Sequence, residues 1–306
     1  MMKYLSLLFV LLISLPNSAG AATLEITPVT KDVWAIIGPL EQRSPENLGN
    51  NATFGVVATN EGVVLIDPGG SYKGAQEIHK LIRGVSDKPV KVVINTGGQD
   101  HRWLGNGYFK ERGAKIIASS AAVEDQKSRG SQQLSGLAIL IGEEGLEGTL
   151  DVYADVTFNE AHDFMLGGIK FQLKHVAPAH TPGDAFVWLP GKNVLFSGDI
   201  IYVKRMLGVG PMSSSRTWPD VFMEIEALKP KYIVPGHGPV SDLATATRDT
   251  RDYLAFLRRE IGQVIDAGGD INEATAINQS AFSYLEVFEQ IKGRNAQQVF
   301  EQMEWE

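Results

Sequence analysis

The 306-residue sequence contains no cysteine and only six histidines. The absence of cysteine excludes thiolate metal sites, cysteine nucleophiles and disulfide scaffolds. A metal site in this chain would therefore have to be built from imidazoles and carboxylates. Charged residues make up 21% of the chain and hydrophobic residues 43%, which is the balance of a folded globular protein rather than of a disordered or fibrous one.

An apolar run of membrane-spanning length is also missing. The run Tyr4–Ile13, which follows Lys3, is shorter than the roughly 20 residues that a transmembrane helix needs. Ala19-Gly20-Ala21 then supplies a small-residue cleavage site, so residues 1–21 are predicted to be a secretory signal cleaved before Ala22. We expect a periplasmic or secreted protein whose mature chain does not insert into a membrane, and the lack of cysteine suits an oxidising compartment.

The mature chain has no excess of positive charge. Lys3 is the only charged residue of the predicted signal, so 27 Lys and Arg remain against 36 Asp and Glu, a formal charge of −9. An acidic surface disfavours nucleic acids and anionic membranes as partners and leaves a small-molecule substrate as the expected one. The sequence also lacks Gly-x-Ser-x-Gly, which disfavours a serine hydrolase.

Two strand-rich halves alternate with helical segments along the chain. Helical spacing predicts helices at residues 74–85, 108–113, 218–228 and 243–267, a helix followed by a loop within 119–148, and a helical tail at 273–301 broken at Gly293. Short β-rich runs predict strands at residues 33–37, 53–58, 62–67, 89–95, 115–118, 156–158, 169–176, 185–189, 194–197 and 231–234.

No linker-like segment follows the signal. We therefore expect one domain over residues 22–306, with a helical C-terminal region from about residue 241 to residue 306. The strand-rich halves and the helices between them predict an α/β fold, in which two β-sheets pack face to face with helices on the outside.

Metal-competent side chains follow the ends of four predicted strands. Because the ends of neighbouring strands converge on one edge of a sheet, these residues can meet although they lie far apart in the sequence. Three imidazoles and two carboxylates form a set that suits zinc, manganese or iron. The five candidate ligands are Asp100, His101, His180, Asp199 and His237.

The order and glycine-rich settings of these segments resemble the metallo-β-lactamase superfamily. The sequence is similar to the exported members found near sulfur-oxidation and quinoprotein systems, with Pro45-Glu46-Asn47 and Gly293-Arg294-Asn295 as further support. The resemblance implies an αββα sandwich with a metal site on one edge. The matching segments are Leu65-Ile66-Asp67-Pro68-Gly69, Asp100-His101 with Gly105-Asn106, His180-Thr181-Pro182-Gly183-Asp184, Ser197-Gly198-Asp199 and Val234-Pro235-Gly236-His237-Gly238.

One motif departs from the family pattern. Members with two metals carry His-x-His-x-Asp-His, and Thr96 and Gly98 stand here in place of the first two histidines. An alignment with a one-residue deletion places Gly97 and Gln99 there, and again both histidines are lost.

The resemblance therefore leaves the two metal positions unequal. The first position keeps only His180 and the bridging Asp199, whereas the second keeps a complete set. We expect one divalent metal, zinc in preference to manganese or iron, and no second tightly held metal. The retained ligands of the second position are Asp100, His101, Asp199 and His237.

The resulting functional hypothesis is a metal-dependent hydrolase. Metal-activated water would cleave an ester, thioester, lactone or amide. Asp100 and His180 are the candidate catalytic residues, and His180 would act as general base or electrophilic donor if its pKa lies near neutrality. Asp67 is expected either to orient the site loops as a second-layer carboxylate or to stabilise a turn. Arg102 and Arg205 are candidates for lining the pocket and pairing with a substrate carboxylate, with solvated surface charge as the alternative.

Two other functions stay open. A catalytically inactive member of the fold would bind a small molecule or a partner in the periplasm. Retention of two neighbouring carboxylates, which repel each other without a cation, favours a bound metal over this alternative. Redox chemistry at a mononuclear iron is disfavoured, because such members use the two histidines that are missing here. Structural roles are expected for His79 on a helix, His162 in a polar loop and His175 on a strand.

Overall fold

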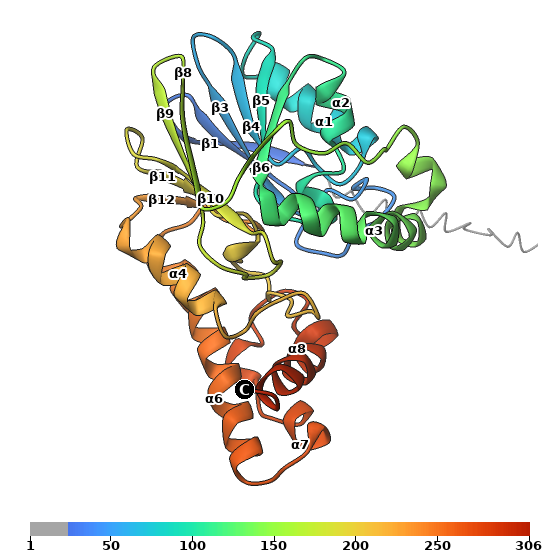
Figure 1. The fold of residues 1–306 in the computed structure, drawn as a ribbon, viewed down its shortest axis with the longest axis vertical. Helices are drawn as coiled ribbons and strands as arrows, with labels where there is room; N and C mark the ends of the chain where they lie inside the picture. The colour runs from blue at the N-terminus through green and yellow to red at the C-terminus, as the bar shows by residue number, and fades with distance from the viewer. Residues whose placement is uncertain (1–23) are drawn as a thin grey trace, which may run out of the picture.

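The computed structural model describes residues 24–306, so the predicted signal at residues 1–21 lies outside the described residues. The chain forms two mixed β-sheets packed face to face, with helices on both outer sides (Figure 1). The predicted αββα sandwich is therefore confirmed. No helix of the described residues combines the length and apolarity that crossing a membrane requires.

The first sheet has seven strands in sequence order. Strands β1 to β4 pair antiparallel, and β4 to β7 pair parallel. The parallel half places the C-terminal ends of β4 and β5 at the same edge, where the loops of the candidate site begin. The strands are β1 (Glu25–Thr30), β2 (Val33–Ile37), β3 (Thr53–Ala58), β4 (Val63–Ile66), β5 (Val90–Asn95), β6 (Lys115–Ser119) and β7 (Val156–Phe158).

The second sheet has five strands in the order β12-β11-β10-β9-β8. Only β11 and β12 pair parallel, so their C-terminal ends lie side by side. All ten strand runs predicted from the sequence form strands, and β1 and β8 are additional. The strands are β8 (Ala161–Leu166), β9 (Ile169–His175), β10 (Ala185–Leu189), β11 (Val194–Phe196) and β12 (Tyr232–Val234).

Helices cover the outer face of each sheet. The first sheet carries α1 and α2, and the second carries α4, α6 and α8. A π-helical turn at Thr247–Arg251 joins α5 to α6 without a break. The helices are α1 (Tyr72–Arg83), α2 (Asn106–Lys110), α3 (Ser120–Leu146), α4 (Trp218–Ala227), α5 (Leu243–Ala246), α6 (Asp252–Asp266), α7 (Ile271–Thr275) and α8 (Phe288–Met303).

The space between the sheets is filled by apolar side chains from both. Val57 and Ile94 of the first sheet pack in one cluster with Phe171 and Phe196 of the second. The fit is close at Gly55 on β3, where an added Cβ would collide with the ring of Phe196. This tight packing fixes the distance between the two sheet edges from which the site residues project.

Three local predictions from the sequence are wrong. The loop expected at the end of 119–148 is a kink at Gly142 (φ 77°, ψ 161°) followed by a further helical turn to Leu146; before the kink, Leu137 and Ile141 of α3 pack against Trp103. Gly293 does not break the tail: α8 runs through it, and the interruption lies before Val287, which has a left-handed backbone. His162 lies on β8, stacked on Phe158, and not in a loop.

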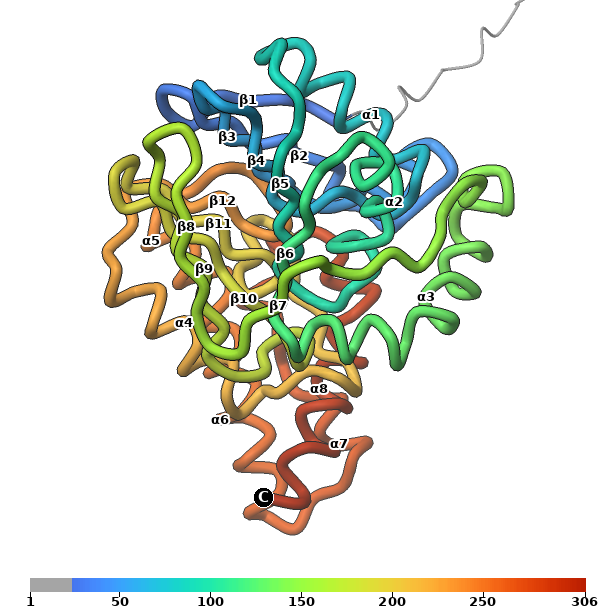
Figure 2. Tube along the Cα trace, turned by 45° about the horizontal axis from the view of Figure 1, so that its top comes forward, coloured from blue at the N-terminus to red at the C-terminus, as the bar shows by residue number. Residues whose placement is uncertain are grey.

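The C-terminal helices α6 to α8 project from the sandwich on the side away from α1 and α2 (Figures 1 and 2). Helix α8 returns toward the sheet edge and is held there by Asn295, which is fully buried. The Asn295 side chain accepts a hydrogen bond from Val209 N at 2.8 Å and donates to Leu207 O at 2.7 Å. It therefore fixes the loop that contains Gly208, whose role in the site is described below.

We expect Asn295→Ala to lower the free energy of unfolding by about 2 kcal/mol, because the amide and carbonyl of the loop would be left buried without partners. Chemical denaturation followed by circular dichroism measures this change. Gln297→Ala on the exposed side of the same helix is the control and should change stability by less than about 0.5 kcal/mol. Equal effects of the two substitutions would contradict the role assigned to Asn295.

Candidate metal centre

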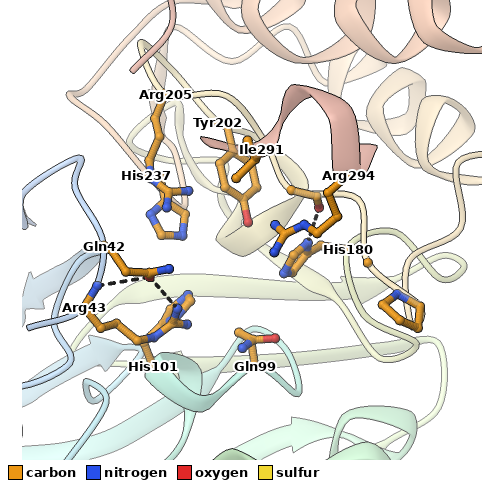
Figure 3. Close-up of a pocket in the computed structure, with 13 residues that line it drawn as sticks. Gln42, Arg43, Gln99, His101, His180, Tyr202, Arg205, His237, Ile291 and Arg294 are labelled. Carbon is orange, nitrogen blue, oxygen red and sulfur yellow. Dashed lines mark hydrogen bonds between the residues drawn. The ribbon is translucent and has the colours of Figure 1, made fainter. Parts of the chain in front are cut away.

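The candidate ligands lie at one edge of the sandwich, as the strand order requires. Asp100 and His101 form a 3₁₀ turn five residues after β5, and Asp199 lies in a second 3₁₀ turn after β11. His237 follows β12, and His180 lies in the loop between β9 and β10. Figure 3 shows His101, His180 and His237 around one cavity.

Three of the five predicted ligands form a compact buried group. His101, Asp199 and His237 each offer one ligand atom, and these atoms lie within 4.8 Å of one another. Nε2 of His101 is 3.1 Å from Asp199 Oδ2, and Nε2 of His237 is 3.2 Å from Asp199 Oδ1. Two imidazoles and a carboxylate match the donor set of a divalent transition metal.

The protonation state of His237 tests whether a cation fits this group. Nδ1 of His237 lies 2.8 Å from the carbonyl oxygen of Asn51, which can only accept, so Nδ1 carries the proton. Burial lowers the pKa of His237 well below its usual value, so the ring is neutral. Its Nε2 lone pair then faces the carboxylate of Asp199, and a cation between these two acceptors would satisfy both.

Asp199 is held in place by a buried arginine. Nη2 and Nε of Arg102 donate to the two carboxylate oxygens of Asp199 at 2.7 and 3.1 Å. Burial alone would raise the pKa of Asp199, but the Arg102 guanidinium and the His101 ring hold it well below its usual value. The carboxylate is therefore ionised at neutral pH.

The predicted substrate-binding role of Arg102 is wrong. Its side chain is fully buried, and its remaining donors go to Asp67 at 2.9 Å and to the carbonyl oxygens of Thr53 and Gly236. It has no donor left for a substrate. A guanidinium tolerates such burial only when it is paired, and two carboxylates pair with this one.

Asp67 joins Arg102 to the loop that precedes Asp100. Its carboxylate accepts hydrogen bonds from the Thr96 amide at 2.8 Å and from the Thr96 hydroxyl. Burial raises the pKa of Asp67 and Arg102 opposes this shift. Asp67 has a left-handed backbone (φ 63°), as the turn after β4 requires.

Asp100 lies outside the three-residue group, because Arg43 holds it. Nη2 of Arg43 donates to Asp100 Oδ1 at 2.5 Å and to Nδ1 of His101 at 2.7 Å. Asp100 Oδ1 also lies 3.0 Å from Nδ1 of His101, but the Arg43 contact is shorter and a guanidinium only donates. We therefore assign Nδ1 as the acceptor, with Nε2–H of His101 directed at Asp199. A metal can bind His101 Nε2 only after the proton moves to Nδ1, which requires Arg43 to release Nδ1. The role of Asp100 as a ligand stays a prediction.

His180 also lies outside the three-residue group. Nδ1 of His180 donates to the carbonyl oxygen of Gly208 at 2.9 Å, which leaves a lone pair on Nε2. Burial lowers its pKa to about 4. The condition of a near-neutral pKa is therefore not met, and a neutral ring with this tautomer accepts a proton rather than donating one to a substrate oxygen.

The glycine pair before Asp100 is explained by close packing against α3. An added Cβ at Gly98 would collide with the carboxylate of Asp125, and one at Gly97 with that of Asp184. Gln133 of α3 donates to the Gly98 carbonyl at 2.8 Å. A side chain at Gly97 or Gly98 would therefore require the carboxylate of Asp184 or Asp125 to shift.

Sequence reasoning missed three residues of the site. Tyr202 stacks on His237 with ring centroids 4.7 Å apart and lies 3.2 Å from Asp199 Oδ1, to which its hydroxyl donates. Arg43 and Arg294 line the cavity from opposite ends of the chain. Arg205, which the sequence did indicate, also lines it. The cavity holds about 250 Å³.

The family follows from a comparison with known proteins. Residues 49–237 match the family model described as the metallo-beta-lactamase superfamily. The chain belongs to this superfamily. Members are metal-dependent hydrolases, and the matched segment contains all five candidate ligands.

Curated relatives within the superfamily act on different substrates. A linear primary-alkylsulfatase from Pseudomonas sp. (strain ATCC 19151) is 23% identical over 70% of this chain, and the match spans about half (47%) of the enzyme. A metallo-beta-lactamase type 2 from Bacillus cereus is 26% identical over 74% of this chain and 80% of that protein. Among solved structures, a metallo-beta-lactamase from Pontibacter korlensis superposes with a TM-score of 0.61 at 21% identity, covering 76% of this chain and 99% of that one, which supports the fold alone.

We expect Arg102→Met to lower the free energy of unfolding at pH 7 by about 3 kcal/mol or more, because two buried carboxylates would lose their cation. The pKa of Asp199 is lower in the folded protein than its ordinary value of 3.8. Its ion pair with Arg102 therefore stabilises the folded protein fully above pH 3.8, and this stabilisation is lost as the pH falls toward the pKa of Asp199 in the folded protein. The difference between wild type and variant should therefore be largest at pH 7 and shrink toward pH 3. Urea denaturation across this range measures it.

The exposed Arg259→Met on α6 provides the matched control. It should leave stability within about 0.5 kcal/mol at every pH. A pH-independent loss in Arg102→Met would show that the arginine acts by packing rather than by charge.

Proposed function

We propose that this chain is an exported hydrolase that uses one divalent metal to cleave an ester, thioester, lactone or amide. The observation that supports this most directly is the buried group of His101, Asp199 and His237, in which the free Nε2 lone pair of His237 faces the carboxylate of Asp199. A divalent cation bound there would lower the pKa of a water molecule toward neutrality and so supply the nucleophile.

The chain's own residues would keep the ligand atoms in place. Arg102 fixes both oxygens of Asp199, and Asn51 fixes the ring of His237 through Nδ1. Tyr202 stacks on the ring of His237 and donates to Asp199. Asp199 and His237 are therefore preorganised and lose little conformational freedom when a cation binds, whereas His101 must first lose its Nδ1 contact with Arg43.

His180 is suited to accept the proton that leaves the nucleophile. Its ring is neutral, its Nδ1–H is used by Gly208, and it lines the same cavity as His101 and His237. A base with a pKa of about 4 is weak, so it would act on an already acidified water. This restricts His180 to the role of general base in the proposal.

A single metal is favoured by the packing of the first-position loop. The Thr96 hydroxyl is bound to Asp67, and Gly98 has no room for a side chain beside Asp125. The metal is proposed to be zinc, with manganese or iron as alternatives, since histidine and carboxylate ligands suit all three. The signal at residues 1–21 supports export to the periplasm or the medium.

Hydrolysis by the metal-loaded mature chain tests the proposal. The protein is stripped of metal with a chelator and reloaded with zinc, manganese or ferrous iron. We expect it to hydrolyse at least one of 4-nitrophenyl acetate, a thioester and a γ-lactone. We expect His101→Ala to abolish turnover and His180→Ala to lower kcat by about 100-fold. His162→Ala on β8, remote from the site, is the matched control and should keep wild-type rates.

Two results would count against parts of this account. Full activity in His180→Ala together with none in His101→Ala would remove the general base. No turnover of any ester, thioester, lactone or amide in any metal form would contradict the hydrolase. It would favour a binding protein of the same fold, for which the pairing of Asp100 with Arg43 and of Asp199 with Arg102 is the supporting observation.

A further inference from the structure

The charged side chains that line the cavity next to His101 and His237 are all positive. Three arginines and three histidines contribute to its wall, and no carboxylate does among the described residues that line it. This is unexpected in a chain with a formal charge of −8. A basic concave surface in an acidic protein concentrates the field of its cations and attracts anions. The charged and imidazole residues are Arg43, His101, His180, Arg205, His237 and Arg294.

Arg205 presents its terminal nitrogens to this cavity. Its Nε donates to the Leu40 carbonyl at 2.7 Å, which orients the guanidinium, and within residues 24–306 its two other nitrogens have no hydrogen-bond partner. The side chain is half-buried, and burial together with the nearby cations Arg43 and Arg294 lowers its pKa. A partly desolvated guanidinium beside two others is stabilised by an anion.

Arg294 reaches the same cavity from α8. Figure 3 shows its side chain extending from the helix toward His180, and it is exposed at the cavity rim. Among the described residues no carboxylate or carbonyl accepts a hydrogen bond from it, although Asn295 next to it is fully bonded. The backbone of α8 fixes the position of Arg294, and the N–H groups of its guanidinium stay available to a ligand.

Arg43 completes the basic wall on the side of the metal group. It donates to Asp100, but its Nε is buried with no partner in the part of the chain that the structure describes. Arg43 and Arg294 both lie outside the segment matched by the family model, residues 49–237. Two of the three arginines of the wall thus come from parts of this chain that the family model does not include.

We propose that Arg205 and Arg294 form an oxyanion-binding subsite that selects small substrates carrying a carboxylate or sulfate group beside the bond to be cleaved. The paired donors of a guanidinium match the two oxygens that either group presents. A cavity of about 250 Å³ lies below the size of drug-binding pockets, which favours a small anionic molecule. The catalytic part of this proposal rests on the proposed hydrolase function, whereas the binding part does not.

Anion binding is tested first, without any turnover. Sodium sulfate and sodium succinate are titrated into the mature protein by calorimetry at constant ionic strength, with chloride as the balancing anion. We expect saturable binding of at least one of them and a loss of affinity of about tenfold or more in Arg294→Gln and in Arg205→Gln. The two probes distinguish a sulfate from a carboxylate preference. Arg259→Gln on α6 should bind as the wild type does.

Turnover then tests selection of the substrate. The metal-loaded enzyme is compared on 4-nitrophenyl acetate and on mono(4-nitrophenyl) succinate, which differ by one carboxylate. Arg294→Gln should lower kcat/KM about tenfold or more for the succinate ester and less than about twofold for the acetate ester. Equal losses on both esters, or wild-type binding of sulfate and succinate by both glutamine variants, would overturn the subsite.

The two proposals fail in different ways. Turnover of the neutral ester with no effect of either arginine variant contradicts the subsite and leaves the hydrolase intact. Arginine-dependent binding of sulfate or succinate without hydrolysis of either ester contradicts the hydrolase for these substrates and supports the subsite.

Discussion

The ion pairs of Arg102 with Asp67 and Asp199 are the interaction on which the rest of the site depends. Arg102 belongs to the loop after β5, and its guanidinium binds the side chains of Asp67 after β4 and Asp199 after β11. It also donates to the carbonyl oxygens of Thr53 on β3 and Gly236 after β12. Without that cation the two carboxylates would repel each other in a buried place. Arg102 therefore lets Asp199 stay ionised and face His101 and His237.

The ion pairs of Asp199 and Asp100 also limit how many of their oxygens are free to bind a metal. Asp199 accepts hydrogen bonds from Arg102 and His101, and Asp100 accepts from Arg43 and from the backbone amide of His101. In the loop before Asp100, a side chain at Gly97 or Gly98 would collide with the carboxylate of Asp184 or Asp125. What remains is the group of His101, Asp199 and His237, which we propose holds one cation, and beside it a basic cavity in which Arg205 and Arg294 stay available to an anion.

The sequence was sufficient to predict the sandwich and the edge at which the candidate ligands lie, because β-strands and the residues that follow them are recognised from local sequence patterns. It was not sufficient for Arg102, whose burial depends on Asp67 and Gly236 far away in the chain. Arg294 belongs to a segment that supported the resemblance, yet nothing in the sequence shows that α8 returns to the site. The packing of Leu137 and Ile141 of α3 against Trp103 likewise joins segments that are far apart in the chain.

Metal stoichiometry tests the central claim most directly. The mature protein, purified without a histidine tag, dialysed against excess zinc and then against buffer, is analysed for metal by inductively coupled plasma mass spectrometry. The account predicts one equivalent per chain, lost in His237→Ala and kept in His162→Ala. Two equivalents per chain, or none even after exposure to zinc, manganese and ferrous iron, would contradict it.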